Sequence, residues 1–133
     1  MRLIYLASPY KHEDEDILRR RKDAAAAAVA FFINSDADIM PYSPIVHWHE
    51  VAVNHELPHD FHFWQTLDFF MIKKSAAFWI LTLEGWRESF GISQELEFSR
   101  DIQKPVLYIT QSSDSADYVL TDVEPTHTIA LPG

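Results

Sequence analysis

Two acidic residues stand where a hydrolytic enzyme would use them. Glu95 lies about one turn inside a predicted helix at 93–103, and Asp68 lies within another at 63–75. Two carboxyl groups that face one cleft can divide the cleavage of a glycosidic bond, with one acting as nucleophile and the other as acid. The chain has 20 acidic residues, so a chance position beside a cleft is the competing interpretation.

The loop that precedes the helix of Glu95 is suited to an anion such as a phosphate. A helix N-terminus presents unpaired backbone N–H groups and the positive end of the helix dipole. Ser89 would add a hydroxyl donor, and Gly91 would let a ligand approach the backbone closely. The same residues also fit a plainer interpretation, in which Ser89 is an ordinary N-cap and Gly91 a turn residue.

Residues 45–63 hold five of the seven histidines and have no clean hydrophobic period, which indicates a long loop with a short helix at most. In an extended segment, His47 and His49 would share one side. Histidine and carboxylate sets bind zinc and non-haem iron, but no HExxH spacing is present. We therefore expect His47 to line the pocket as a donor, and a metal-dependent hydrolase built on this loop remains an alternative.

Two tyrosines near the first predicted strand are the remaining candidates. Tyr5 lies inside the strand and would ordinarily be a core residue, whereas Tyr10 lies in the following loop. A tyrosine at the end of a strand can offer its phenol to a nearby carboxylate.

The elements that would position these groups alternate along the chain. The predicted strands are 2–8, 37–44, 76–83 and 104–110, and the predicted helices are 12–34, 63–75 and 93–103. The first helix carries a predicted buried stripe of Ile17, Ala24, Ala28, Phe31 and Phe32. Alternating strands and helices favour an α/β sandwich with a mostly parallel sheet. Ligands of such sheets bind beyond the carboxyl ends of the strands. Three candidate loops lie there: the loop after the first strand, the histidine-rich segment 45–63, and the loop that leads into the helix of Glu95.

Length and composition limit the classes of protein further. With 133 residues and 47% hydrophobic residues, the chain is expected to form a single domain, 1–133, with a core at 1–110 and a tail at 111–133. A net charge of −9 argues against a nucleic-acid partner. The absence of cysteine excludes disulfides and thiolate metal sites. The first apolar run is too short for a secretion signal or a membrane span, which favours a cytoplasmic protein without a membrane partner. The tail would add a strand or reach a neighbouring subunit.

The order and spacing of four short motifs resemble the nucleoside 2-deoxyribosyltransferase superfamily. The motifs are IYLASPY near the N-terminus, LD at 67–68, SFGISQEL and KPVLYI. Within the superfamily, the chain is similar to the DUF1937 branch of uncharacterised bacterial and phage proteins over most of residues 1–110. The resemblance implies a Rossmann-like (flavodoxin-like) three-layer fold and assembly into homodimers or larger homo-oligomers. It also implies cleavage of the N-glycosidic bond of deoxynucleosides or their 5′-monophosphates, without a cofactor or metal.

The resemblance also implies roles for individual residues. Glu95 would be the nucleophile that attacks C1′, Asp68 would contact the sugar or base and assist protonation, and Tyr5 would orient the nucleophile. Ser89 and Gly91 would hold a 5′-phosphate.

Two positions depart from the pattern of the family. Ser8 stands in the first loop, where relatives often have a glycine, and we expect it to contact the substrate. Transferases of the family carry a further aspartate near 76–78, where this chain has only apolar residues. A non-catalytic nucleotide-binding module on the same fold is therefore the main alternative to an enzyme.

Overall fold

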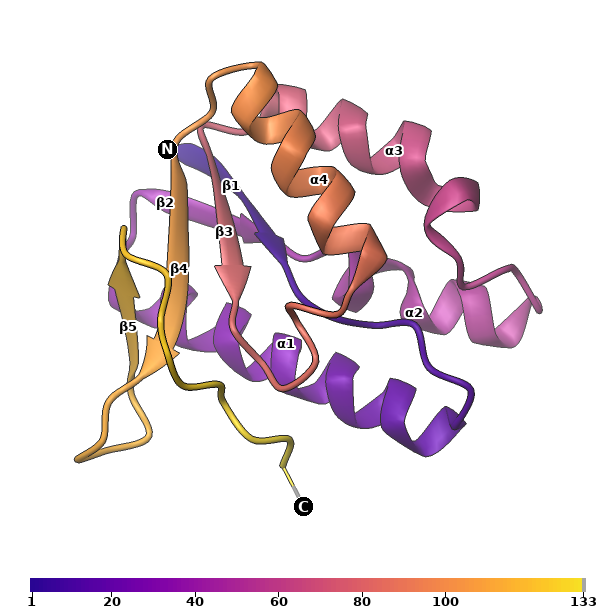
Figure 1. Ribbon diagram of the computed structural model, residues 1–133, viewed down its shortest axis with the longest axis horizontal. Helices are drawn as coiled ribbons and strands as arrows, with labels where there is room; N and C mark the ends of the chain where they lie inside the picture. Colours follow the sequence, from indigo (N-terminus) through magenta and orange to yellow (C-terminus); the bar gives the residue numbers. More distant parts are fainter. Residues whose placement is uncertain (133) are drawn as a thin grey trace.

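The computed structural model describes residues 1–132, and at its centre lies a five-stranded sheet (Figure 1). The strands are β1 (Arg2–Ala7), β2 (Ile39–Tyr42), β3 (Ala77–Leu81), β4 (Val106–Gln111) and β5 (Tyr118–Thr121). Their spatial order is β2-β1-β3-β4-β5; the first four strands are parallel, and β5 is antiparallel to β4. This is the flavodoxin-like order, which reverses between β1 and β3. The reversal leaves a crevice beyond the carboxyl ends of these two strands.

Four helices cover the two faces of the sheet. They are α1 (Glu15–Ser35), α2 (Pro44–Asn54), α3 (Phe61–Lys74) and α4 (Phe90–Asp101). Helices α3 and α4 pack side by side on one face, whereas α1 covers the other face and is contacted by α2 (Figure 1). The predicted Rossmann-like three-layer α/β sandwich with a mostly parallel sheet is thereby confirmed.

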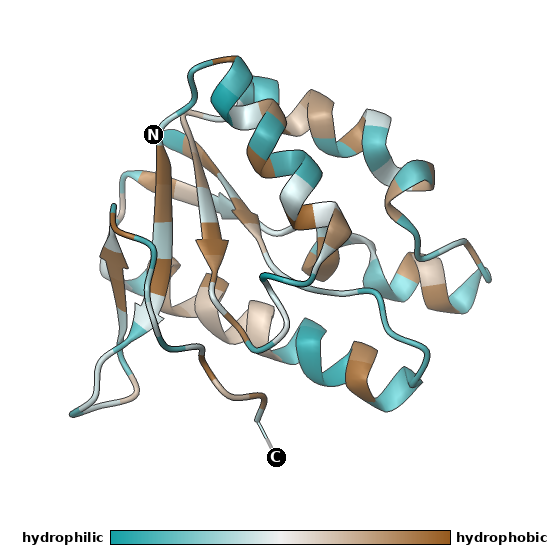
Figure 2. Ribbon diagram, viewed as in Figure 1, coloured by the Kyte–Doolittle hydropathy of each residue, from teal (hydrophilic) through white to brown (hydrophobic). Residues whose placement is uncertain are grey.

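Both faces of the sheet are buried, and β1 shows how its sequence produces this. Successive strand residues point to opposite faces, so Ile4 and Leu6 pack with α1, while Tyr5 and Ala7 pack with α3 and α4. Figure 2 shows hydrophobic residues gathered along the central strands, whereas the helices carry hydrophilic and hydrophobic residues in alternation. Of the predicted stripe on α1, Ala24, Ala28 and Phe32 are buried, and Ile17 and Phe31 are half-buried.

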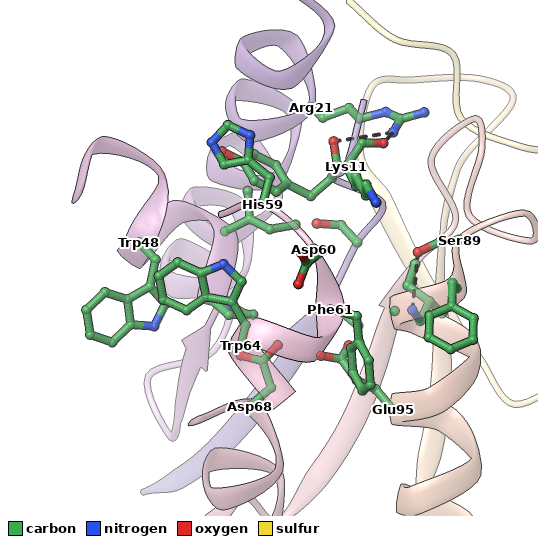
Figure 3. Close-up of a pocket in the computed structure, with 18 of the residues that line it drawn as sticks. Lys11, Arg21, Trp48, His59, Asp60, Phe61, Trp64, Asp68, Ser89 and Glu95 are labelled. Carbon is green, nitrogen blue, oxygen red and sulfur yellow. Dashed lines mark hydrogen bonds between the residues drawn. The ribbon is translucent and has the colours of Figure 1, made fainter. Parts of the chain in front are cut away.

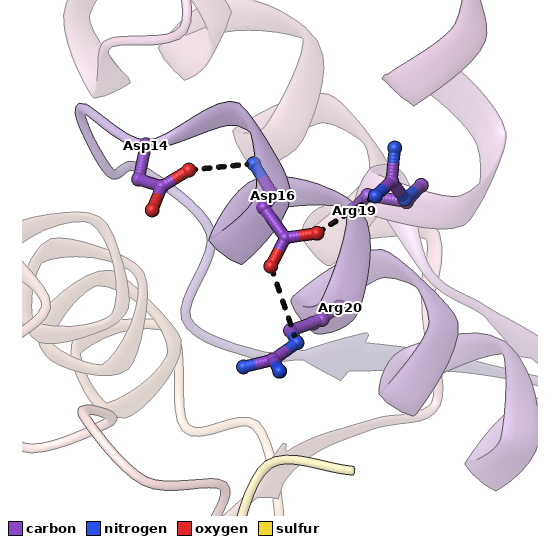
Figure 4. Close-up of polar contacts among 4 residues, drawn as sticks. All are labelled: Asp14, Asp16, Arg19 and Arg20. Atoms are coloured by element: carbon purple, nitrogen blue, oxygen red, sulfur yellow. Dashed lines mark hydrogen bonds and ion pairs between the residues drawn. The ribbon is translucent and has the colours of Figure 1, made fainter. Parts of the chain in front are cut away.

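The start of α1 follows from its charged residues. Asp14 is the N-cap, and its side chain accepts a hydrogen bond from the backbone N–H of Asp16 at 2.8 Å. Asp16 also pairs with Arg19 at 2.7 Å and with Arg20 at 3.4 Å (Figure 4). These pairs are exposed, so the cap contributes more to the stability of this end than the ion pairs do.

The prediction of a long loop with a short helix at 45–63 understates the helix, because α2 occupies the first half of the segment and α3 begins before its end. Ser43 caps this helix by accepting a hydrogen bond from the N–H of Val46, and Pro44 stands in its first turn. Both are ordinary helix-start signals. The hydrophobic period is missing because α2 buries only Pro44, His49 and Ala52.

The tail adds a strand, as one of the two alternatives for it predicted. Strand β5 pairs with β4, and further on Ile129 forms a bridge with Leu83. The backbone of Ile129 donates to Thr82 O at 2.8 Å and accepts from Glu84 N at 2.8 Å. The tail therefore contacts the loop between β3 and α4. None of the helices within residues 1–132 has the length and hydrophobicity that a membrane crossing requires.

Candidate active site

A cavity of about 590 Å³ opens where the strand order reverses (Figure 3). Its walls come from the loop after β1, from α2, from the first turns of α3, and from the loop that leads into α4. The volume is in the range of small-molecule sites. Since the crevice at a topological switch point is where doubly wound sheets bind their ligands, the cavity stands at the expected place.

Two predicted residues, Asp68 and Glu95, line this cavity, and a third, Tyr5, lies behind them in the core. The phenol of Tyr5 on β1 donates a hydrogen bond to Glu95 Oε2 on α4 at 2.8 Å. Asp68 on α3 lines the cavity together with Glu95 (Figure 3). Tyr5 is fully buried, Glu95 is 6% exposed and Asp68 is 8% exposed. Oδ1 of Asp68 is buried and has no hydrogen-bond partner within the described chain.

Burial changes the acidity of both carboxyl groups. It raises the pKa of Glu95 well above its ordinary value, and the negative charge of Asp68 raises it further, while the hydrogen bond from Tyr5 acts in the opposite direction. Burial also raises the pKa of Asp68 to about 6. Because two neighbouring carboxylates do not readily ionise together, the pair keeps a proton to a higher pH than either carboxyl group would alone. The site thus combines a proton donor with a second carboxyl group.

The three small residues that we predicted at the site also line the cavity. Ser8 is buried, and its hydroxyl has no partner within residues 1–132. Ser89 is the N-cap of α4 and accepts from Ile92 N at 3.2 Å, so its own hydroxyl hydrogen stays available. At Gly91 an added Cβ would meet only Phe61, at 3.6 Å, and Ser89, at 3.9 Å. The neighbouring atoms therefore leave room for a Cβ at position 91, and no steric reason requires a glycine there.

His47 is not where we predicted it. It is exposed and lies outside the cavity lining, whereas His49 is buried and lies within it. The reason is that this segment is a helix and not an extended chain. Residues two apart share one side of an extended chain but face different directions on a helix. The Tyr10 hydroxyl lies 2.6 Å from Nδ1 of His49, and burial lowers the pKa of that histidine.

The five histidines of this region do not form a metal site. His59 packs edge-on against Tyr10 with its ring centre 5.8 Å away, while His47, His55 and His62 are exposed. Across residues 1–132, no group of three or more histidines and carboxylates is placed to hold a metal ion. The metal-dependent alternative thus gains no support.

Two further sets of residues line the cavity and were not predicted from the sequence. One is a pair of cations, Lys11 and Arg21, which lie away from Asp68 and Glu95 in the view of Figure 3. The other is a group of aromatic side chains on α2, α3 and α4: Trp48, Phe61, Trp64 and Phe90. The ring centres of Trp48 and Trp64 are 5.6 Å apart. Nothing in the sequence brings the two cations together.

The fold and the cavity define a doubly wound α/β protein with two buried carboxyl groups in a crevice at the reversal of its strand order. Residues 2–111 match a family described as a domain of unknown function, DUF1937, and the chain belongs to that family. The predicted DUF1937 branch is thereby confirmed. No curated protein matches the chain significantly.

Proposed function

We propose that this protein cleaves the N-glycosidic bond of a (deoxy)nucleoside or a nucleoside 5′-monophosphate. The observation that carries the proposal is the buried pair Asp68 and Glu95, which lines a cavity of ligand size and in which Glu95 accepts a hydrogen bond from the buried phenol of Tyr5. Retaining glycosidases divide their chemistry between two such carboxyl groups. The substrate is a small molecule, and no bound cofactor is needed for this chemistry.

In the proposed reaction, the proton of the carboxyl pair passes to Asp68, and the carboxylate that this leaves on Glu95 attacks C1′ of the sugar. The C1′–N bond breaks, its electron pair leaves with the base, and the base takes up the proton that the carboxyl pair retains. Asp68 is the group that assists this transfer. Water then attacks C1′, the bond to Glu95 breaks, and Asp68 accepts the proton of the water. A second base in place of water gives a transferase.

Tyr5 supports the nucleophile in this scheme. Its hydrogen bond to Glu95 Oε2 fixes one carboxyl oxygen and favours the ionised form. Burial raises the pKa of Tyr5 well above its ordinary value, so the phenol keeps its proton and remains a donor at neutral pH.

The aromatic side chains support a planar leaving group. Trp48, Phe61 and Trp64 border the cavity, and a purine or pyrimidine ring stacks favourably on such faces. Stacking depends on the flat shape and the polarisability of the ring, so the aromatic side chains favour a nucleobase but do not select one base over another.

A chromatographic screen for release of free base from nucleosides and their 5′-monophosphates tests the proposal. Glu95→Gln keeps the shape of the side chain but removes the nucleophile, so base release should fall by about a thousandfold or more. Glu97→Gln is the matched control, because Glu97 lies on the same helix and is exposed. Base release by Glu95→Gln at the rate of the parent protein would refute the assigned role.

We also propose that the protein acts in the cytoplasm as a homodimer or a larger homo-oligomer. An exposed row on α3 supports self-association, since Phe63, Leu67 and Phe70 are each more than 40% exposed. Light scattering after size-exclusion chromatography measures the assembly, and a monomer at micromolar concentration would contradict it.

A further inference from the structure

The guanidinium group of Arg21 is only partly used by the protein. Its Nη1 donates to the backbone carbonyl of Lys11 at 2.9 Å and to that of Tyr10 at 3.4 Å. Nε of Arg21 is buried and has no hydrogen-bond partner within residues 1–132. The free Nε–H and the adjacent Nη2 form the side-on edge of the guanidinium, which matches the oxygens of a phosphate or carboxylate in pairs.

Gly85 lies against this edge of Arg21. Both residues line the cavity, and an added Cβ at position 85 would stand 2.7 Å from Nη2 of Arg21. The φ of Gly85 is +95°, a region that residues with a side chain rarely adopt. The loop after β3 therefore passes close to the guanidinium only because this position has no side chain.

A second cation, Lys11, and the hydroxyl of Ser89 line the same cavity as Arg21. Figure 3 shows Lys11 next to Arg21, on the side of the carboxyl pair, and Ser89 at another edge of the cavity. Ser89 is at the N-terminus of α4, where the helix dipole favours negative charge. Acidic groups also border this part of the protein, because Asp60 and Glu88 line the cavity and the charge of Glu84 acts on Arg21. Asp60 is occupied as the N-cap of α3.

We propose that the free edge of Arg21, with Lys11 beside it, binds a phosphate group of the substrate. Resting on the function proposed above, this inference narrows the substrate to a nucleoside 5′-monophosphate, with the nucleoside a poor ligand. A buried guanidinium nitrogen without a partner costs stability in the free protein. A bound phosphate removes that cost, because it supplies acceptors for Nε and Nη2 together. The base then extends toward the aromatic side chains.

Equilibrium binding tests this assignment without relying on turnover. In the Glu95→Gln background, titration calorimetry measures the dissociation constants of the four deoxynucleosides, their 5′-monophosphates and inorganic phosphate. At least one monophosphate should bind about ten- to a hundredfold more tightly than its nucleoside, since a charge-assisted bond is worth this factor. Arg21→Gln should remove that preference and leave nucleoside binding within about twofold.

Two further variants separate binding from folding. Arg21→Lys keeps the charge and one hydrogen bond but lacks the side-on edge, so it should recover only part of the preference for phosphate. Arg19→Gln is the matched control on the same helix, since Arg19 is exposed and pairs only with Asp16 within the described residues (Figure 4). Its binding should equal that of the parent. A thermal melt of each variant confirms that it is folded before binding is compared.

The outcomes separate this inference from the proposed function. A phosphate preference that depends on Arg21, without base release by the parent protein, supports the phosphate site and refutes the glycosidase. Base release from nucleosides and monophosphates alike, unchanged in Arg21→Gln, supports the glycosidase and overturns the phosphate site. The site is also overturned if no monophosphate binds, or if inorganic phosphate alone binds and does so independently of Arg21.

Discussion

Replacing Asp68 by asparagine should stabilise the protein at neutral pH. The carboxyl group is 8% exposed, and one of its oxygens has no hydrogen-bond partner in the described chain. Burial raises its pKa from 3.8 to about 6. The folded state therefore binds this proton more tightly than the unfolded state does, and the free energy of unfolding falls as the pH rises through this interval.

The size of the effect follows from the shift. The pKa of Asp68 rises by about 2 units, and each unit corresponds to about 1.4 kcal/mol, so ionising this group costs about 3 kcal/mol of stability between pH 4 and pH 7. Glu95 acts in the same direction, because its pKa is raised as well. Asparagine has the same shape and cannot ionise. Asp68→Asn should thus gain up to about 3 kcal/mol over the parent at pH 7 and almost nothing at pH 4.

Urea denaturation at several pH values between 4 and 8 measures this difference. Comparing the variant with the parent at each pH cancels the general repulsion of a chain with a net charge of −9. Glu97→Gln serves as the control, because it removes an exposed carboxyl group on α4 and leaves the buried pair unchanged. A difference between Asp68→Asn and the parent that stays constant from pH 4 to pH 8 would refute the reasoning.

Two more substitutions test the packing of the site. Tyr5→Phe keeps the ring but leaves Glu95 Oε2 without its buried donor, so chemical denaturation should show a loss of about 1–3 kcal/mol; an unchanged midpoint would contradict the hydrogen bond. Gly85→Ala should destabilise by about 1–3 kcal/mol, because it combines a positive φ with a contact to Arg21. Gly91→Ala, whose Cβ meets only ordinary contacts, should raise stability by up to about 1 kcal/mol in the same assay; equal losses at both glycines would contradict this contrast.

Two kinds of element could be predicted from the sequence: strands with a continuous apolar run, and helices with strong start and composition signals. Strand β3 is buried along its whole length, and α1 combines an acidic first turn with an alanine-rich face, so both were recognised. Helix α2 was missed because it lies mostly at the surface and buries few residues. Its start signals, Ser43 and Pro44, were present and would have identified it.

The residues of the candidate site also fall into two groups, those that the sequence suggested and those that only the structure shows. Glu95 and Asp68 line one cavity and Tyr5 contacts Glu95, an arrangement that the order of the family motifs suggested. Arg21 was not identified, because on the sequence it is one of four successive basic residues in a helix. Only the three-dimensional structure shows that one of the four turns toward the cavity and leaves a nitrogen without a partner.

The tail shows that the region of family similarity and the unit that folds are different in extent. The match ends at residue 111, the last residue of β4, yet β5 and Ile129 lie beyond it and hydrogen-bond to the sheet and to the loop after β3. A fragment cut at the end of the match would leave β4 as an open edge, which invites pairing between molecules. It would also release the loop that carries Gly85 and leads to Ser89. Fragments designed for expression should therefore extend at least to residue 131.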